Sequence, residues 1–183
     1  TGSTIKKHER VFLKDTLSIN SFLWAGRIIY VRNKDSKIFD TNAKKWGKNI
    51  LNPEINDGDS FATNYLYHPY FGALYYQVYR DLGYDKNDAF LGTIIQSTLW
   101  EFTIEGTVEK PSVIDLAVTP GLGIPLGLYF EKINIELSES DSKLKKTLSY
   151  LINPARLFFD EGNLGFITPL TKTFMIYKPF RYR

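Results

Sequence analysis

The sequence predicts a mainly α-helical single domain over residues 1–183, with a central antiparallel helix hairpin, a kinked glycine-rich helix and an extended C-terminal tail. Apolar residues recur at three- and four-residue spacings through most of the chain, as on one face of a helix. Turn-forming residues separate these segments, and the helical period is lost after residue 162. A chain of 183 residues has single-domain length and buries about 70% of the surface that it exposes when unfolded.

The N-terminal region is expected to hold two helices. Residues 8–31 carry apolar side chains at helical spacings. After a polar turn, Asp35 or Ser36 is expected to cap a short helix through Trp46. Gly47 is expected to end that helix, because glycine is common just after a helix C-terminus.

Residues 52–60 are the clearest loop in the chain, since they read Asn-Pro-Glu-Ile-Asn-Asp-Gly-Asp-Ser. Asp57 and Asp59 offer carboxylates to a cation, but they lack the spacing of a calcium-binding loop. We therefore expect this segment to be a solvated loop.

The central hairpin is expected to pair residues 69–83 with residues 88–105. His68-Pro69 is expected at or near a helix start, where proline is tolerated, and Gly83 is expected to stop the helix. Asp85 then offers an N-cap for the second helix. Because the link is only about five residues long, the two helices are expected to be antiparallel neighbours.

A further helix is expected to begin at Ser112, whose hydroxyl can accept a free N–H while Asp115 reaches back to the cap. Thr119-Pro120 predicts a kink or a break. The segment continues to about Leu137 and contains small residues that either allow another backbone to approach closely or mark a loop crossing. These residues are Gly121, Gly123 and Gly127.

The C-terminal region is expected to change from helix to extended chain. Residues 143–151 form an amphipathic pattern that ends before Asn153-Pro154. Residues 162–183 contain two further prolines and several β-formers, which predicts an extended tail.

The amino-acid composition excludes several kinds of function for this protein. Absence of cysteine excludes disulfides, thiol catalysis and zinc-thiolate sites. The net charge is +3 and Lys and Arg are spread along the chain, which argues against a nucleic-acid partner. No run of 18 strongly apolar residues is present, so no membrane-spanning helix is expected. Residues 1–3, Thr-Gly-Ser, are expected to be the remnant of a removed segment, and no signal peptide is visible.

The polar residues that are expected to lie close together come from one face of a helix and from one histidine. Ser97, Glu101 and Glu105 are spaced four apart and form a stripe on a helix. Antiparallel packing would bring His68, early in one helix, near Glu101, late in the next. Together with Asp115 these residues form the candidate set. Glu101 is expected to be buried and to accept several hydrogen bonds, because the helix around it is largely apolar.

Four roles for this set remain open. The carboxylates can tie the helices together by accepting hydrogen bonds, or aromatic residues can line a pocket for a lipid or another apolar ligand. Alternatively, His68 and Glu101 can act as acid and base. Metal binding is the fourth role, but neither Glu-x-x-His nor His-Glu-x-x-His is present, so no metal and no cofactor is assigned. The candidate ligand-binding residues are Tyr75, Tyr76, Tyr79, Trp100 and Arg80.

Several linked motifs span residues 64–154. They read Asn64-Tyr65, His68-Pro69-Tyr-Phe-Gly72-Ala-Leu-Tyr75-Tyr76, Arg80-Asp-Leu-Gly83, Ser97-Thr-Leu-Trp100-Glu101, Glu105, Glu109-Lys-Pro111-Ser112, Asp115-Leu116, Thr119-Pro120 and Asn153-Pro154. Together they resemble the bacterial domain-of-unknown-function family 3943, which is known mainly from Gram-negative envelopes. The resemblance implies a compartment and a residue set, without a mechanism.

The resemblance implies a location in the periplasm or at the outer membrane of a Gram-negative bacterium. The expected partners are lipid at the inner face of that membrane or another envelope protein. We therefore expect a non-catalytic envelope domain that binds or scaffolds through a buried His/Glu/Asp network. The alternative is a lipid-directed hydrolase or transferase that uses His68 and Glu101 as acid and base.

Overall fold

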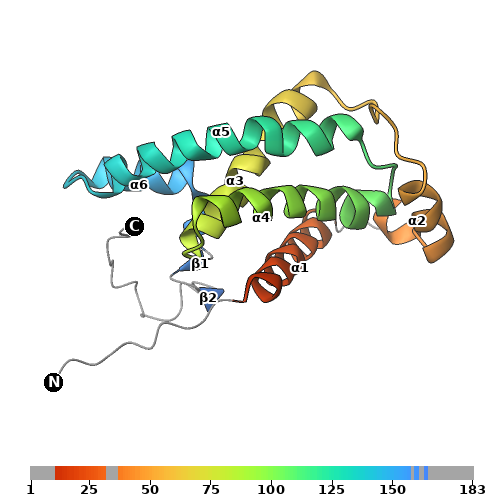
Figure 1. Ribbon diagram of the computed structural model, residues 1–183, viewed down its shortest axis with the longest axis horizontal. Coiled ribbons are helices and arrows are strands. Elements are labelled where there is room, and N and C mark those ends of the chain that lie inside the picture. The colour runs from red at the N-terminus through yellow and green to blue at the C-terminus, as the bar shows by residue number, and fades with distance from the viewer. Residues whose placement is uncertain (1–10, 32–36, 158, 161–162, 165–183) are drawn as a thin grey trace.

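The computed structural model describes residues 11–31, 37–157, 159–160 and 163–164, and these residues form a mainly α-helical structure, as predicted (Figure 1). The helices are α1 (Phe12–Tyr30), α2 (Ala43–Ile50), α3 (His68–Asp81), α4 (Lys86–Leu99), α5 (Val113–Ser138) and α6 (Lys143–Ile152). The short strands β1 (Phe159–Asp160) and β2 (Asn163–Leu164) pair antiparallel, with Phe159 opposite Leu164. Apart from β2, the predicted tail over 162–183 lies outside the described residues.

Helices α3 and α5 form the centre of the fold. Helix α4 packs against both of them, and α6 folds back beside the end of α5 (Figure 1). Helix α1 lies against α4, whereas α2 lies beside the turns that follow α4 (Figure 1). The two central helices therefore determine where the other elements are placed.

The contacts between α3 and α5 repeat every four residues at a constant separation of 51 positions. The contacting pairs are His68 with Thr119, Gly72 with Gly123, Tyr76 with Gly127 and Arg80 with Glu131. Residues four apart lie on the same face of a helix. Because both members of each pair advance together along the chain, α3 and α5 run in the same direction.

Two glycines allow the backbones of α3 and α5 to touch. A Cβ atom on Gly72 would lie 2.0 Å from the carbonyl oxygen of Thr119. A Cβ atom on Gly123 would lie 2.6 Å from the Cα atom of Gly72, and one on Gly127 would lie 2.9 Å from the Tyr76 ring. The close backbone approach expected in this segment is therefore present at Gly123, whereas Gly127 lies against a side chain. At Gly121 the close approach is absent, because nothing lies within 4 Å of an added Cβ.

A buried ion pair joins the far ends of the same two helices. Arg80 Nε donates to Glu131 Oε1 at 2.8 Å, and Arg80 Nη2 lies 2.8 Å from the same oxygen. The hydroxyl of Tyr76 donates to Glu131 Oε2 at 3.1 Å. Removing one member of such a buried pair typically costs about 3–5 kcal/mol, because the other charge is left without a partner.

The apolar core lies where α1, α3 and α4 meet. Tyr79 is at its centre: its hydroxyl bonds to the Thr16 hydroxyl at 2.8 Å and accepts a hydrogen bond from Gln96 Nε2 at 3.2 Å. The buried members of the core are Ile19, Tyr76, Val78, Tyr79, Leu82, Tyr84, Ala89 and Ile124.

Helix α5 buries polar and small residues and exposes apolar ones. Its buried residues are Asp115, Thr119, Gly123, Ile124, Gly127, Glu131, Asn134 and Ser138. Its opposite face exposes Leu122, Leu128 and Tyr129. By length and composition α5 could cross a membrane, with a mean hydropathy of 1.5 over an 18-residue window. The expectation that no helix spans a membrane stays a prediction, because the core helix of a soluble protein can have the same length and composition.

Two predicted boundaries in the N-terminal region need correction. Helix α1 begins at Phe12, and residues 8–10 lie outside the described part of the chain. Asn42, not Asp35 or Ser36, caps α2 by accepting the Lys45 N–H at 3.0 Å. The helix also continues through Gly47 to Ile50. Tertiary contacts explain the extension, because side chains on both sides of Gly47 bond to carbonyl groups after α4.

The α-helix α3 begins at His68, as predicted, but helical structure extends further toward the N-terminus. Helical structure begins at Phe61 and passes through a π-helical turn, Thr63–Tyr67, directly into α3. The Ser60 hydroxyl accepts the Thr63 N–H at 3.1 Å and caps this longer helix. The wide π turn directly precedes Pro69. Proline has no backbone N–H, so inside a regular helix one backbone hydrogen bond would be missing at this position. Gly83, with φ of 91°, ends the helix as predicted.

The caps of α4 and α5 follow the prediction more closely. Asp85 accepts two backbone N–H groups at 2.8 and 2.9 Å and starts α4. Helical structure then continues past Leu99 through π and 3-10 turns to Thr107. Ser112 caps α5 by accepting the Asp115 N–H at 3.3 Å. The antiparallel orientation of α3 and α4 stays a prediction.

Of the kink or break predicted at Thr119-Pro120, the break is wrong, because α5 is continuous through Pro120 and Pro125, and the kink stays a prediction. A proline inside a helix costs about 3 kcal/mol. Packing of α5 against α3, α4 and α6 offsets this cost. Helix α6 ends at Ile152, before Asn153-Pro154, as predicted.

Gly123→Ala is expected to destabilise the domain, because its Cβ would lie 2.6 Å from the Gly72 Cα atom and the backbone must shift. Overpacking of this kind costs about 1–3 kcal/mol. Gly121→Ala is the matched control in the same helix and should stabilise by up to about 1 kcal/mol through helix propensity. Urea unfolding measures the change in the free energy of unfolding for both variants. Equal changes in Gly123→Ala and Gly121→Ala would contradict the close approach of Gly123 to Gly72.

Candidate functional site

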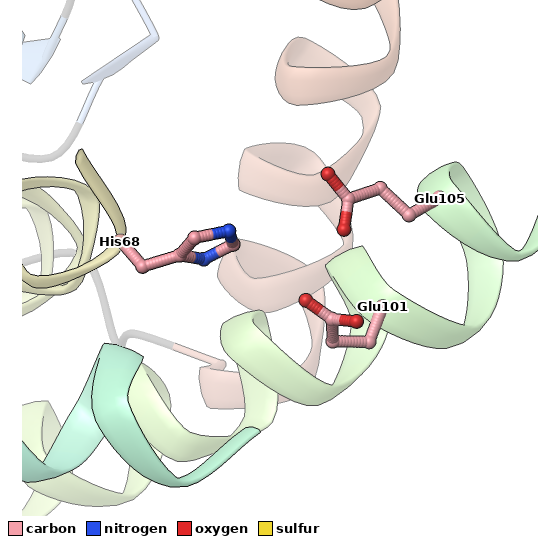
Figure 2. Close-up of side chains that lie close together, drawn as sticks. All are labelled: His68, Glu101 and Glu105. Atoms are coloured by element: carbon pink, nitrogen blue, oxygen red, sulfur yellow. The ribbon is translucent and has the colours of Figure 1, made fainter. Parts of the chain in front are cut away.

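His68, Glu101 and Glu105 converge on one point between α3 and the turns after α4. One potential ligand atom from each side chain lies within 4.8 Å of the other two. Figure 2 shows the imidazole and both carboxyl groups pointing toward a common space. His68 and Glu101 are buried, and Glu105 is half-buried. The predicted juxtaposition of His68 with Glu101 is therefore present.

Local structure fixes the orientation of His68. The residue lies at the start of α3, directly after the π turn, and its Nδ1 atom is 3.0 Å from the Thr119 hydroxyl on α5. This bond belongs to the repeating contacts between α3 and α5. It leaves Nε2 on the other side of the ring for a different partner.

The carboxyl group of Asp115 lies next to His68 and has no hydrogen-bond partner among the described residues. Its Oδ1 atom is 3.7 Å from His68 Nε2, and the side chain is fully buried. Neither carboxyl oxygen has a hydrogen-bond donor within range among the described residues. Burial raises the pKa of Asp115 to about 6. A buried carboxylate in this state is costly unless a positive charge accompanies it.

Glu101 takes the place in the α5 cap that the sequence assigned to Asp115. The backbone N–H of Ser112 donates to Glu101 Oε2 at 3.0 Å. Glu101 is only 1% exposed, so the predicted burial is confirmed. Its other close polar neighbour is the carboxyl group of Glu105, whose charge adds to the increase in the pKa of Glu101.

The loop 52–60 is not simply a solvated loop. Its backbone pairs with the start of α5: Glu54 N–H donates to Pro111 O at 3.0 Å, and Val113 N–H donates to Glu54 O at 2.9 Å. This pairing brings Asp57 close enough for its charge to raise the pKa of Asp115. The partner segments are more than fifty residues apart, so local turn signals give no indication of this contact.

The clustered carboxyl groups raise one another's pKa values. Burial raises the pKa of Glu101 to about 9, and Glu105 adds to this increase. Burial, followed by the charge of Glu105, raises the pKa of Glu109 to about 7. Burial and then Glu105 and Glu101 also raise the pKa of Tyr75. Glu101 therefore keeps its proton at neutral pH, whereas the charge of Arg27 opposes the increase in the pKa of Glu109.

A family model described as domain of unknown function (DUF3943) matches residues 54–155, more than half of the chain. The chain belongs to the DUF3943 family. No curated protein and no solved structure is significantly similar to it. The DUF3943 match confirms the resemblance seen in the sequence and extends ten residues further toward the N-terminus, to residue 54 instead of residue 64. All the carboxyl groups described above lie inside it.

The other candidate residues of this DUF3943 domain are distributed over separate contacts. Tyr75 lies beside the glutamates, as its pKa shift shows. Arg80 and Tyr76 belong to the Glu131 ion pair, and Tyr79 belongs to the core network with Thr16 and Gln96. The structure therefore does not gather the proposed ligand-binding residues around one pocket.

Ser97 and Trp100 lie on α4 and the turn that follows it. Ser97 is buried, and its hydroxyl has no hydrogen-bond partner within the described residues. It precedes Glu101 by one helical turn, and no contact with His68 supports a nucleophilic role. Trp100 is half-buried. Sequence reasoning considered Asp57 only as a residue of the loop 52–60 and left both Asp57 and Glu109 out of the candidate set.

The free energy of unfolding is expected to fall as the pH rises from about 5 to 9. The folded protein keeps the Glu101 proton up to a pKa of about 9, whereas the unfolded chain releases it near 4.5. Each such proton lowers the stability by up to about 1.4 kcal/mol per pH unit. Glu101→Gln keeps a neutral side chain of similar shape and should flatten this slope.

Urea unfolding at pH 5, 7 and 9 measures the slope. Glu136→Gln is the matched control, because Glu136 is exposed on α5, and it should keep the wild-type slope. Identical slopes in the wild type and Glu101→Gln would contradict a raised pKa at Glu101.

Proposed function

We propose that this DUF3943 domain is a membrane-associated domain of the Gram-negative cell envelope, in the periplasm or at the outer membrane, with a binding or scaffolding role. The observation that carries the proposal is the reversed polarity of α5, which buries polar residues and exposes apolar ones. In water such a helix face is unfavourable, because each Å² of apolar surface removed from water is worth about 25 cal/mol. Contact with lipid removes this cost.

The exposed face of α5 is suited to acyl chains over most of its length. Leu122 is 51% exposed and Tyr129 is 59% exposed. No charged residue occurs between Asp115 and Glu131, and both of these are buried. Exposed charges begin only at Lys132. A helix with one apolar face and a charged end lies in the membrane interface, and aromatic residues such as Tyr129 favour that region.

The polar interior supports scaffolding within this proposal. The Arg80 pair with Glu131 and the Glu101 bond to Ser112 join elements that are distant in the sequence. Buried and bonded groups of this kind maintain one arrangement of the helices. The envelope location rests on the family resemblance, and the dispersed basic residues give no support for a nucleic-acid partner.

The purified domain is expected to float with phosphatidylethanolamine and phosphatidylglycerol vesicles in a density gradient. Leu122→Glu or Leu128→Glu should each reduce the bound fraction about tenfold, because burying one leucine contributes about 1.5–3 kcal/mol. Leu51→Glu is the matched control: Leu51 is 79% exposed but lies at the end of α2 and is not part of the exposed face of α5.

A wild-type domain that stays at the bottom of the gradient would contradict lipid contact. Equal losses in Leu122→Glu and Leu51→Glu would contradict the assignment to α5. Fractionation of cells that make the full-length protein tests the compartment separately, and a purely cytosolic protein would overturn the envelope location.

A lipid-directed hydrolase or transferase is the second candidate, favoured by the convergence of His68 and Glu101 (Figure 2). With a pKa of about 9, Glu101 would act as the proton donor and His68 as the base. Mass spectrometry of phospholipid vesicles incubated with the domain tests this role. Lipid products that form with the wild type and not with His68→Asn would support the enzymatic role. If the lipids stay unchanged with the wild type, only the binding role is supported.

A further inference from the structure

We infer that His68, Glu101, Glu105 and Asp115 form a binding site for one divalent first-row transition-metal ion of the zinc or manganese type. The inference does not depend on the membrane proposal, because it concerns the interior of the domain. It rests on the geometry of the four side chains, on the unpartnered oxygens of Asp115 and on the surrounding negative charge.

The distances leave room for a shared ion. Potential ligand atoms of His68, Glu101 and Glu105 all lie within 4.8 Å of one another. Two ligands with metal bonds of about 2.1 Å can be at most about 4.2 Å apart. The three groups must therefore close by about half an ångström, which side-chain rotation can supply. Figure 2 shows all three already oriented toward the same space.

Asp115 provides an independent indication of a missing cation. Its side chain is fully buried, its Oδ1 atom lies 3.7 Å from His68 Nε2, and neither oxygen has a hydrogen-bond donor within range in the described part of the chain. Buried polar atoms normally have a partner, and a carboxylate without one is a costly exception. A metal ion beside His68 Nε2 would supply the partner.

The bond between His68 and Thr119 matches the usual support of a metal-binding histidine. A ligating histidine normally donates its second ring N–H to a neighbouring oxygen, which fixes the tautomer and the ring orientation. Here Nδ1 lies 3.0 Å from the Thr119 hydroxyl, so donation from Nδ1 leaves the Nε2 lone pair free toward Asp115.

The ligand types select the class of ion. Imidazole suits zinc, iron and copper, whereas carboxylates suit manganese, magnesium and calcium. One histidine with three carboxyl groups fits zinc or manganese better than calcium, which takes six to eight oxygen ligands. Three further carboxyl groups surround the set and increase the local negative charge. They belong to Asp57, Asp59 and Glu109.

The test uses the full chain after treatment with EDTA and dialysis. Isothermal titration with Zn²⁺ and with Mn²⁺ is expected to show one ion bound per chain. Zn²⁺ should bind more tightly than Mn²⁺, following the general order of divalent metal affinities. Mg²⁺ and Ca²⁺ should produce little heat, and bound Zn²⁺ should raise the melting temperature.

Glu105→Gln should weaken Zn²⁺ binding at least about tenfold, because it replaces a carboxylate ligand by an amide. Glu109→Gln is the matched control, because it removes a neighbouring charge and leaves the four ligands intact. The Zn²⁺ affinity of this variant should stay within about twofold of the wild-type affinity. Asp115→Asn provides a second ligand variant with similar volume if Glu105→Gln does not fold.

Two results would overturn the inference: no Zn²⁺ or Mn²⁺ bound to the folded wild-type chain, or equal Zn²⁺ affinities in Glu105→Gln and Glu109→Gln. Metal analysis of the wild-type chain after dialysis gives the stoichiometry independently of the variants. Unaltered Zn²⁺ binding in a folded Asp115→Asn variant would remove Asp115 from the ligand set.

Discussion

The backbone contact between Gly72 and Gly123 is the constraint on which the rest of the structure depends. Because neither residue has a side chain, α3 and α5 meet closely enough to hold one register over the length of α3. One turn before this contact, the register pairs His68 with Thr119, and two turns after it, Arg80 with Glu131. A single close approach therefore positions both the candidate site and the buried ion pair.

The interior of the domain is unusually polar, and its surface carries many apolar side chains. Glu101 illustrates the consequence, because one carboxyl group completes the α5 cap through Ser112 and also faces His68 and Glu105. Structural and chemical roles are therefore combined in the same residues. An interior of this kind is stable only when its polar atoms have partners. Asp115 lacks one within the described residues, which distinguishes the candidate site from the Arg80 ion pair.

The sequence determined the features that depend on neighbouring residues. The N-caps at Asp85 and Ser112 and the stop at Gly83 were predicted, because each depends on a side chain or a conformation within a few residues. The four-residue spacing of Glu101 and Glu105 likewise placed both on one side of a helix. The helical content and the family membership could also be predicted from such local patterns.

Tertiary structure decided the features in which distant segments compete with local preference. Helix α5 continues through Pro120, and α2 continues through Gly47, because packing and long-range hydrogen bonds outweigh the local signals to stop. The position of Asp57 beside Asp115 depends on backbone pairing between segments more than fifty residues apart. The physical reason is the sequence distance over which the interactions act. A cap or a turn depends on residues within one helical turn, whereas the burial and the electrostatic neighbours of a residue exist only after the helices have packed.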